Sequence, residues 1–332
     1  MDFTQFIGQQ NVKDNLQLLI NAAKKGRTFP HIGLYGPAGS GKTTLAEIIC
    51  EELGAELIYI NGAAVTTPVI FRKPIAKAVQ KKGKEKQYII FIDECHCLPK
   101  KVQENMLSVT EAPAILCTPV ERKMKLPNGS FLQKGDILKE KLPENVSFIL
   151  ATTDKGKING PLSTRLHPIN LDEYTLDNKQ QVVSNTLKTH NVVLEDEDAE
   201  LIGSIGKSMR HIVKLCARII DFAVGENRCV LDHEDVLRII DILGINELGC
   251  DKTDQRYLDY VRSRGPVSLS NIAGYLNVEE KEVKEKVEPF LIRKEWVEIT
   301  SKGRVITACG FIQVYDEQHP DAAEDLMSFI MS

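Results

Sequence analysis

Short apolar segments recur through the first half of the chain, at residues 31–35, 57–60, 88–92 and 146–150. Each is about as long as a strand and is rich in Ile, Val, Leu or aromatic residues. Continuous apolarity without alternation is typical of strands that helices cover on both faces. The stretches between them have helical periodicity. This succession predicts an α/β domain with a mostly parallel sheet over residues 1–170.

The next part of the chain has a purely helical pattern. An apolar stripe with helical spacing is formed by Ile212, Leu215, Cys216, Ile219, Ile220 and Ala223. Further on, Asp232 has the position of an N-cap and Gly244 that of a helix end. We therefore predict a helical domain over residues 171–248.

A third pattern starts near Cys250. Three segments of helical character precede two predicted strands, at residues 254–262, 269–276, 279–291, 296–300 and 304–307. Ser301-Lys302-Gly303 is typical of a hairpin turn between the strands. Helices followed by such a hairpin predict a winged-helix domain over residues 249–310. Residues 311–332 contain five acids and no Lys or Arg, so we interpret them as a solvated acidic C-terminal extension.

Composition narrows the class of protein. Forty-six acidic and forty-two basic residues give the 332-residue chain a net charge of −4, which excludes a uniformly basic coat but not a local basic patch. The eight cysteines form no CxxC pair, so we expect neither a zinc site nor a disulfide framework. No apolar run approaches the roughly 20 residues that span a bilayer. We expect a cytoplasmic protein that does not act at a membrane.

The strongest chemical signal is a phosphate-binding loop. Gly36-Pro37-Ala38-Gly39-Ser40-Gly41-Lys42-Thr43 matches G-x-x-x-x-G-K-[ST] in full, between a predicted strand and a predicted helix. Gly36, Gly39 and Gly41 let backbone N–H groups turn toward phosphate oxygens at a helix N-terminus. Lys42 can reach the β- and γ-phosphates of ATP, the Thr43 hydroxyl can bind Mg²⁺, and Thr44 extends the nucleotide pocket. A chance glycine turn, the alternative, would lack this context.

Two adjacent carboxylates follow the apolar segment at residues 88–92. Asp93 and Glu94 would stand at the carboxyl end of a strand, where ligands bind in open α/β sheets. We predict that Asp93 holds Mg²⁺ and that Glu94 orients and polarises the attacking water. Two acids after a strand are otherwise usually a solvated loop, and the complete phosphate loop favours the catalytic interpretation. We expect His96 to pack or hydrogen-bond rather than to shuttle protons.

The whole pattern resembles the AAA+ P-loop ATPases, and more closely the RuvB family of Holliday-junction branch-migration motors. The matching stretches include Phe6-Ile7-Gly8-Gln9, LYGPAGSGKTTLA from Leu34, FIDECHCLP from Phe91, ATT from Ala151, PLSTRL from Pro161, GKSMRHIVKLCARIIDFA from Gly206, GPVSLSNIAGYL from Gly265 and KGRVIT from Lys302. A phosphate loop alone occurs with many unrelated functions. Its ordered succession with the other stretches, through the winged-helix segment, is much more specific.

The resemblance implies a nucleotide pocket with further walls. Ile7 and Gly8 would border the adenine, and Tyr174 would contribute from the junction with the helical lid. Thr153 would be the first sensor of the γ-phosphate, at the end of the strand predicted at residues 146–150. Core packing is the alternative role for Tyr174, and threonine is common at strand ends.

The resemblance also implies roles for four cationic residues. Arg165 would be an arginine finger presented to the ATP of a neighbouring subunit, and Arg210 a second sensor that reaches the γ-phosphate from the lid. Arg304 and Lys302, in the wing, would contact DNA. The alternatives are a surface ion pair for Arg165, a solvated helix face for Arg210 and a solvated rim for the wing.

By the same resemblance, the protein would use ATP and Mg²⁺, assemble as a ring, expected to be a hexamer, and act on duplex DNA or four-way junctions with a RuvA-like partner. The chain departs from the family pattern at Ser163, where many relatives have a second arginine, and at Met209, where they have proline. Residues 113–145 are longer and more polar than the partner-binding hairpin of the family, and Asn128-Gly129 predicts a hairpin turn there. Two other functions remain open: a nucleotide switch that loads a helicase or clamp onto DNA, and a winged-helix regulator with a vestigial ATP site.

Overall fold

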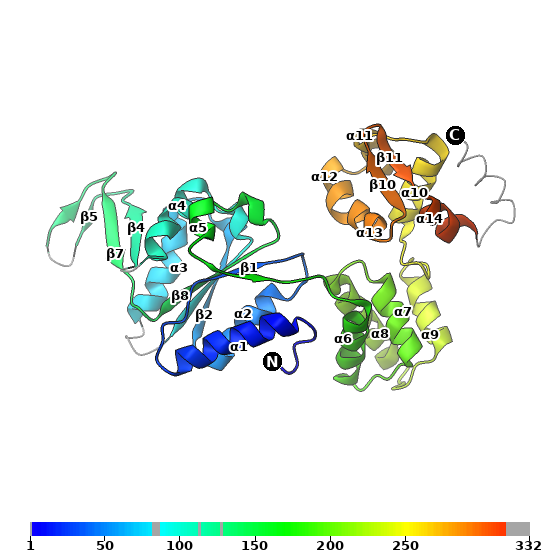
Figure 1. Ribbon diagram of the computed structural model, residues 1–332, viewed down its shortest axis with the longest axis horizontal. Coiled ribbons are helices and arrows are strands. Elements are labelled where there is room, and N and C mark those ends of the chain that lie inside the picture. The colour runs from blue at the N-terminus through cyan, green and yellow to red at the C-terminus, as the bar shows by residue number, and fades with distance from the viewer. Residues whose placement is uncertain (1, 82–86, 112–113, 127–128, 317–332) are drawn as a thin grey trace. The chain divides into compact units, whose positions relative to one another are not determined.

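The computed structural model describes residues 2–81, 87–111, 114–126 and 129–316, and it divides into two compact units after Thr175 (Figure 1). Two apolar clusters form the core of the first unit. Two others lie in the second unit, one under the predicted lid and one under the predicted winged helix. Each of the three predicted folding patterns therefore has a hydrophobic core of its own.

The first unit is built around a five-stranded sheet in which all neighbouring strands are parallel. In sheet order the strands are β2 (Glu56–Asn61), β3 (Tyr88–Asp93), β8 (Val146–Thr152), β1 (Ile32–Tyr35) and β9 (His167–Asn170). The parallel sheet and its four predicted strands are confirmed. The prediction misses β9 because Ile169 is its one aliphatic residue. Pro168, which lacks an N–H group, is tolerated there because β9 lies at the sheet edge beside β1.

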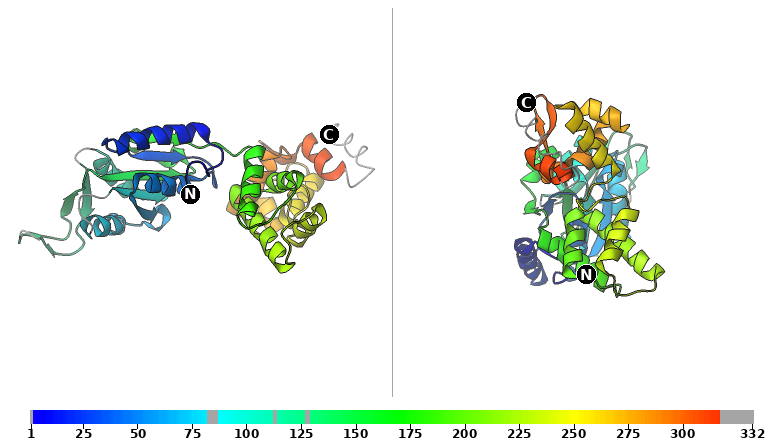
Figure 2. Two further views of the ribbon diagram at one scale, coloured as in Figure 1. Left: turned by 90° about the horizontal axis from the view of Figure 1, so that it is seen from below. Right: turned by 90° about the vertical axis from the view of Figure 1, so that its right-hand side faces the viewer.

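Both faces of this sheet are covered. In β3, Ile90 and Ile92 belong to one apolar cluster, whereas Ile89 and Phe91 belong to the other, as the two-residue period of a strand requires. One face packs against α1 and α2, and the other against α3 and α4 (Figure 2). These helices are α1 (Gln10–Lys24), α2 (Lys42–Leu53), α3 (Pro68–Lys81) and α4 (Lys100–Val109).

A long hairpin extends from this sheet domain between α4 and β8 (Figure 1). Its antiparallel strands pair β4 with β7 and β5 with β6, and they are β4 (Ile115–Pro119), β5 (Met124–Lys125), β6 (Phe131–Leu132) and β7 (Ile137–Lys141). The predicted hairpin is confirmed. Gly129 has a φ of +88° at its turn, and Asn128 lies outside the described residues. An ion pair between Arg72 of α3 and Glu140 of β7 ties the hairpin to the sheet domain.

The second unit begins with four helices, α6 (Leu176–Lys188), α7 (Asp196–Ile205), α8 (Met209–Gly225) and α9 (His233–Ile242). The predicted stripe on α8 is buried except for Ile220, which is half-buried. Asp232 caps α9, because its side chain accepts the N–H of Asp235, and Gly244 follows with a φ of +68°. The all-helical character of this part of the chain and both predicted ends of α9 are therefore confirmed.

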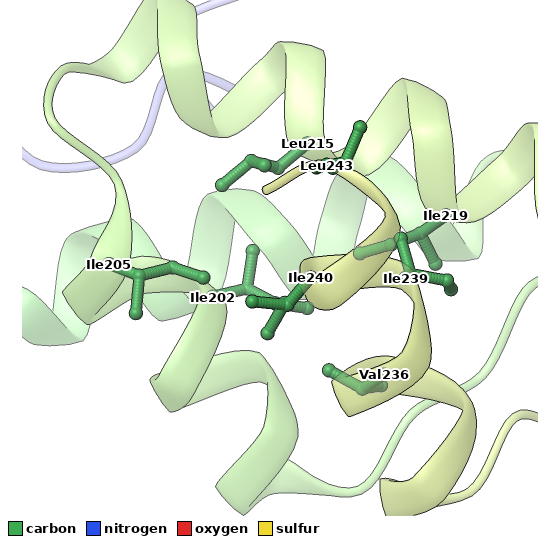
Figure 3. A pocket seen from close by; sticks show the side chains of 8 residues that line it. All are labelled: Ile202, Ile205, Leu215, Ile219, Val236, Ile239, Ile240 and Leu243. Atoms are coloured by element: carbon green, nitrogen blue, oxygen red, sulfur yellow. The ribbon is translucent and has the colours of Figure 1, made fainter. Parts of the chain in front are cut away.

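The core of these four helices is closely packed (Figure 3). An apolar cavity of about 10 Å³ remains among Ile202, Ile205, Leu215, Ile219, Val236, Ile239, Ile240 and Leu243. Such a space is no larger than a single water molecule needs, and it has no polar side chain to hold one. It is a small packing void and not a ligand site.

The rest of the second unit is a winged helix. Its elements are α10 (Lys252–Arg264), α11 (Leu269–Leu276), α12 (Glu280–Glu282), α13 (Glu288–Arg293) and the antiparallel strands β10 (Val297–Thr300) and β11 (Gly303–Ile306). The predicted helix over residues 279–291 is confirmed, because the helical conformation runs without interruption through α12, the turn at Val283–Val287 and α13. The turn at Val283–Val287 is a π-helical turn, which is wider than an α-helical one. Pro289 accounts for this wider turn, because it has no N–H group and its ring clashes with the carbonyl four residues earlier.

The interpretation of the chain from residue 311 as a solvated extension also needs correction. Phe311 ends α14 (Ala308–Phe311), and both Phe311 and Tyr315 are buried in the winged-helix core. Residues 308–315 contain no acid, and their aromatic side chains pack into this core, so the acidic part of the segment begins only at Asp316. The remaining residues of the predicted acidic extension, 317–332, lie outside the described residues.

Candidate nucleotide site and nucleic-acid interface

The phosphate loop joins the end of β1 to the start of α2. Gly39 and Gly41 have φ angles of +82° and +90°, in the left-handed region that favours glycine. The Nζ atom of Lys42 donates to the carbonyl oxygens of Gly36 and Pro37, at 2.8 Å each. The lysine ammonium therefore lies against the loop backbone at a helix N-terminus, where both the helix dipole and the cation favour a phosphate.

Three hydroxyl groups stand beside this lysine. Ser40 is buried, and its hydroxyl has no hydrogen-bond partner among the described residues. Thr43 and Thr44 are half-buried in the first turn of α2. A buried hydroxyl without a partner is costly, so the loop is built to accept an outside polar group, and the phosphates of a nucleotide fit that requirement.

Aromatic side chains lie close to the loop at Gly41. A Cβ atom added to Gly41 would lie 2.6 Å from the ring of Phe6 and 3.3 Å from the hydroxyl of Tyr174. Burial raises the pKa of the Tyr174 phenol, which therefore stays protonated. The structure thus brings Tyr174 to the phosphate loop. Phe6 is a neighbour of the loop that sequence reasoning missed, because an aromatic residue near the N-terminus gives no local signal of its partner.

Ile7 and Gly8 belong to a segment that is tied to the one containing Tyr174. The side-chain amide of Gln9 donates to the carbonyl of Asp172 at 2.7 Å and accepts the N–H of Asp172 at 3.2 Å. Gly8 and Gln9 both have positive φ, +68° and +53°, which turns the chain at this point. The three residues predicted to border the adenine thus come from two joined segments, and Gln9, which was not predicted, joins them.

Asp93 ends β3 at the carboxyl edge of the sheet. Its two carboxylate oxygens accept the Tyr59 hydroxyl at 3.1 Å and the N–H of Glu94 at 3.0 Å. A Cβ atom added to Gly62 would lie 2.5 Å from the carbonyl oxygen of Glu94, so only glycine lets the chain after β2 pack here. Tyr59 and Gly62 orient the predicted Mg²⁺ ligand, although neither was predicted from the sequence.

Glu94 has a φ of +48°, a left-handed conformation that costs a non-glycine residue of order 1–3 kcal/mol. Its carboxylate lies 3.3 Å from Nδ1 of His96. The same nitrogen lies 2.8 Å from the hydroxyl of Thr152, a fully buried residue that also accepts the N–H of Asp154. The expectation that His96 hydrogen-bonds is confirmed, and through it Glu94 is linked to the end of β8.

Thr153, the predicted first sensor, directly follows the last residue of β8. Its side chain is exposed, whereas that of Thr152 is directed to His96 and buried. The two adjacent threonines therefore face in different directions, as the alternation along a strand dictates. Thr153 stands at the carboxyl edge of the sheet, the edge that Asp93 and the phosphate loop share.

The predicted Mg²⁺ ligands, Thr43 and Asp93, are oxygen donors at this edge. Hydroxyl and carboxylate oxygens suit Mg²⁺, which keeps several waters and is usually held by one or two protein groups together with substrate phosphates. The part of the chain that the structure describes contains no group of three or more His, Cys, Asp or Glu that could hold a metal by itself. The donor set therefore fits a magnesium ion that arrives with a nucleotide.

Arg165 is bound within its own chain. Its guanidinium donates to the carbonyl of Leu107 at 2.6 Å and pairs with Glu111, which lies just after α4. The alternative role, an ion pair, is thus the arrangement that the structure contains, and the arginine-finger role stays a prediction.

Arg210 is the second residue of α8 in the second unit, and its side chain is exposed. Ser208 caps this helix by accepting the N–H of His211. The capped first turn holds Arg210 at the start of a well-formed helix, pointing to solvent. Its role as a second sensor stays a prediction.

The two wing residues differ in their surroundings. Lys302 lies in the turn between β10 and β11 and is exposed. Arg304, on β11, is turned inward, and its guanidinium pairs with Glu288 of α13, with Nε 2.8 Å from Oε1 and Nη2 3.4 Å from Oε2. Glu288 also accepts the hydroxyl of Tyr257 at 3.1 Å. In this arrangement the Arg304 charge is neutralised inside the domain, whereas Lys302 faces solvent.

All eight cysteines are free, and burial raises the pKa of Cys50, Cys95, Cys216 and Cys250 to about 12, which leaves those thiols unreactive. Across the described ranges, none of the helices has both the length and the apolarity to cross a bilayer.

Comparisons with known proteins agree with this geometry. Residues 1–171 match the family model described as the Holliday junction DNA helicase RuvB P-loop domain, and residues 247–314 match that of the RuvB C-terminal winged helix domain. The chain is 31% identical to the Holliday junction branch migration complex subunit RuvB of Campylobacter hominis over 311 residues, or 92% of this chain and 86% of the relative. The same subunit of Rickettsia africae is 31% identical over 313 residues, again 92% and 86%.

A solved structure extends the likeness to three dimensions. The Thermotoga maritima RuvB Holliday junction branch migration motor has a TM-score of 0.74 to this chain at 28% identity, and the match covers 94% of this chain and 96% of that one. The likeness therefore includes the sheet domain, the helical lid and the winged helix.

Proposed function

Because the chain belongs to the RuvB family, we propose that it is an ATP-driven motor that moves the branch point of Holliday junctions in recombination and repair. One observation supports the proposal above all. A complete phosphate loop and the adjacent acids Asp93 and Glu94 share the carboxyl edge of one parallel sheet, in a chain that also has a winged-helix domain.

The chain's own residues would bind ATP and activate water. Lys42 would hold the β- and γ-phosphates against the loop backbone, with Ile7, Gly8 and Tyr174 at the adenine. Thr43 and Asp93 would hold Mg²⁺, which when bound neutralises phosphate charge. Glu94 would orient the water that attacks the γ-phosphorus, so that the bond to the bridging oxygen breaks and ADP and phosphate leave.

Several residues would complete this site or connect it to its surroundings. Thr153 and Arg210 would sense the γ-phosphate from the strand end and from the lid. Arg165 would enter the ATP site of the next subunit in a hexameric ring, a contribution worth about 10³–10⁵ in turnover for an inserted arginine. Its ion pair with Glu111 is partly exposed, so it can be exchanged for a phosphate at little cost.

The proposed motor would work in the cytoplasm on duplex DNA and four-way junctions, together with a RuvA-like partner. The free state of all eight cysteines supports the reducing compartment. The hairpin formed by β4 to β7 is the surface that we propose for the partner, because it extends from the sheet domain and exposes Phe131 and Ile137.

Turnover of ATP tests the site. Lys42→Ala should lower the rate because the phosphates lose their cation, and Glu94→Gln should lower it by about 10²–10⁴-fold, the usual effect of losing a general base. Lys25→Ala and Glu47→Gln, which change exposed residues of α1's end and of α2, are the matched controls and should keep the wild-type rate. Wild-type turnover in both site variants would mean that the residues are wrongly assigned.

A synthetic four-way junction with labelled arms tests the motor. We expect ATP-dependent strand exchange by the wild-type chain with a RuvA-type partner and none with Glu94→Gln. Hydrolysis of ATP without strand exchange, together with stimulated loading of another helicase or clamp, would overturn the motor in favour of a nucleotide switch.

Mixing two inactive variants tests the shared site. Arg165→Ala keeps Glu94, and Glu94→Gln keeps Arg165, so a mixture should regain part of the ATP turnover if the arginine acts on the neighbouring subunit. A mixture as inactive as its components would contradict the arginine-finger assignment.

A further inference from the structure

Lys207 lies immediately before α8, three residues before Arg210. Its ammonium pairs with Asp251, 2.5 Å away, and with Asp254, both at the start of α10 in the winged helix. The backbone carbonyl of Lys207 accepts the guanidinium of Arg293, at the end of α13. The segment that leads into the Arg210 helix is therefore tied to two helices of the winged-helix domain.

The contact between Lys207 and Asp254 is a buried one. The Asp254 side chain is completely inaccessible, and that of Lys207 is 18% exposed. Burial alone would lower the pKa of Lys207, but the carboxylates of Asp254 and Asp251 raise it above its ordinary value, so the ammonium stays charged. A buried ion pair of this kind is costly to open, because a partner left alone would be a desolvated charge.

The two carboxylates are themselves held by the helix that they begin. Asp251 caps α10 and accepts the N–H groups of Thr253 and Asp254, while Asp254 accepts the N–H of Asp251 in return. Lys207 therefore does not bind a flexible side chain. It binds the fixed first turn of α10, and any displacement of Lys207 must move that turn or break the pair.

The chain that connects the lid to the winged helix is also tightly packed at Gly249. Gly249 has a φ of +87°, and a Cβ atom there would lie 2.8 Å from the backbone of Ile205, the last residue of α7. It would lie 3.1 Å from the ring of Phe290 in α13. Backbone in such close contact behaves as part of a core and not as a linker.

We propose that Lys207 is a positioning residue that couples the nucleotide state read by Arg210 to the winged-helix domain. A shift of the first turn of α8 would move Lys207 and, through its contacts, α10 and α13. The close packing around Gly249 would keep the lid and the winged helix from moving independently. The inference rests on the proposed function, since it takes Arg210 as the nucleotide sensor and the winged helix as the DNA-binding part.

The test compares basal with DNA-stimulated ATP turnover in the full-length protein. Lys207→Met keeps the length and apolar stem of the side chain but removes its charge. We expect basal turnover and junction affinity to stay near wild type, while the stimulation by junction DNA falls about tenfold, within the usual range of coupling between sites. Lys207→Arg should restore it. The control is Lys214→Met, which changes an exposed lysine of α8.

A second variant keeps the test decisive if Lys207→Met does not fold. Arg293 is exposed, so Arg293→Met removes the contact with the Lys207 carbonyl and keeps the buried pair of Lys207 with Asp254, and it should lower the stimulation less, by a few-fold. Wild-type stimulation in a folded Lys207→Met protein, or in Arg293→Met where Lys207→Met is unfolded, would overturn the coupling. Failure of the proposed function looks different, because then Lys42→Ala would retain basal turnover.

Discussion

The ion pair between Arg304 and Glu288 makes a sharp prediction about the wing. Glu288 is 2% exposed, and its carboxylate has two partners, the Arg304 guanidinium and the Tyr257 hydroxyl. The Arg304 side chain is 13% exposed. Arg304→Ala therefore leaves the buried Glu288 carboxylate with the Tyr257 hydroxyl as its one hydrogen-bond donor. Burial raises the pKa of Tyr257, so the phenol keeps its proton and does not neutralise the carboxylate.

The cost follows from the burial of Glu288. Removing one partner of a buried ion pair destabilises a protein by roughly 3–5 kcal/mol. Because Arg304 keeps some exposure, water can enter where its side chain was, and we expect the lower end, about 3 kcal/mol. A small domain loses about 1–3 kcal/mol of stability per molar urea. The midpoint of winged-helix unfolding should therefore fall by about 1–3 M urea.

Trp296 provides the assay, because it is the single tryptophan of the sequence and lies in the winged-helix core, 1% exposed. Its fluorescence during urea unfolding reports on that domain alone. Lys302→Ala, in the exposed turn of the same hairpin, is the matched control and should leave the midpoint unchanged. The double variant Arg304→Met with Glu288→Met should recover much of the loss, since apolar replacement of a whole buried pair is often neutral.

One result would refute this reasoning. If Arg304→Ala unfolds at the wild-type urea concentration but binds junction DNA more weakly, the Arg304 guanidinium pairs with DNA and contributes little to stability through Glu288. The DNA contact that the family resemblance implies would then be right for Arg304, and the ion pair would be a state that DNA displaces.

Three further predictions concern other parts of the chain. Gly41→Ala should weaken ATP binding at least tenfold in a titration with a fluorescent nucleotide, because its Cβ would overlap Phe6, whereas Gly54→Ala, which also has a positive φ but nothing within 4 Å, should not. Burial lowers the pKa of His31 from 6.5 to about 4, so between these pH values the unfolded chain binds more protons than the folded one. Calorimetry should show the free energy of unfolding falling by up to about 3 kcal/mol as the pH drops from 6.5 to 4. His31→Asn should remove that dependence. Lys302→Ala should reduce the slope of junction affinity against salt concentration by about one, with little effect of DNA sequence.

Local sequence was sufficient for the elements whose signal is local. Strands buried on both faces are continuous apolar runs, and helix α9 is announced by its cap at Asp232 and its end at Gly244. Strand β9 was not predicted, because it is defined by its pairing with β1 and not by an apolar run of its own. Its position at the sheet edge allows Pro168, which lacks an N–H group. The helix over residues 279–291 was found from its periodic apolar residues, whereas its π-helical turn at Val283–Val287 has no periodic signal beyond Pro289.

The residues of the candidate site also differ in whether their signal is local in the sequence. The phosphate loop and Asp93 could be found because each is a short motif next to its own strand. Phe6, Gln9 and Tyr59 could not, because each acquires its role from a residue far away in the sequence, such as Asp172 for Gln9. Sequence patterns identify the groups that touch a ligand more readily than those that hold these groups in place.

Two of the three arginines that the family resemblance singled out show why burial must be known before a role is assigned. Both form an ion pair within the chain, Arg165 with Glu111 and Arg304 with Glu288. The Arg165 side chain is 29% exposed and that of Glu111 59%, so their pair is worth about 0–1 kcal/mol and a phosphate can replace the carboxylate. The carboxylate of Glu288 has no such access to water. Release of Arg304 would leave that charge unpaired inside the domain, so Arg304 is held by its ion pair with Glu288. Release of Arg165 from Glu111 costs little, and its arginine-finger role stays a prediction.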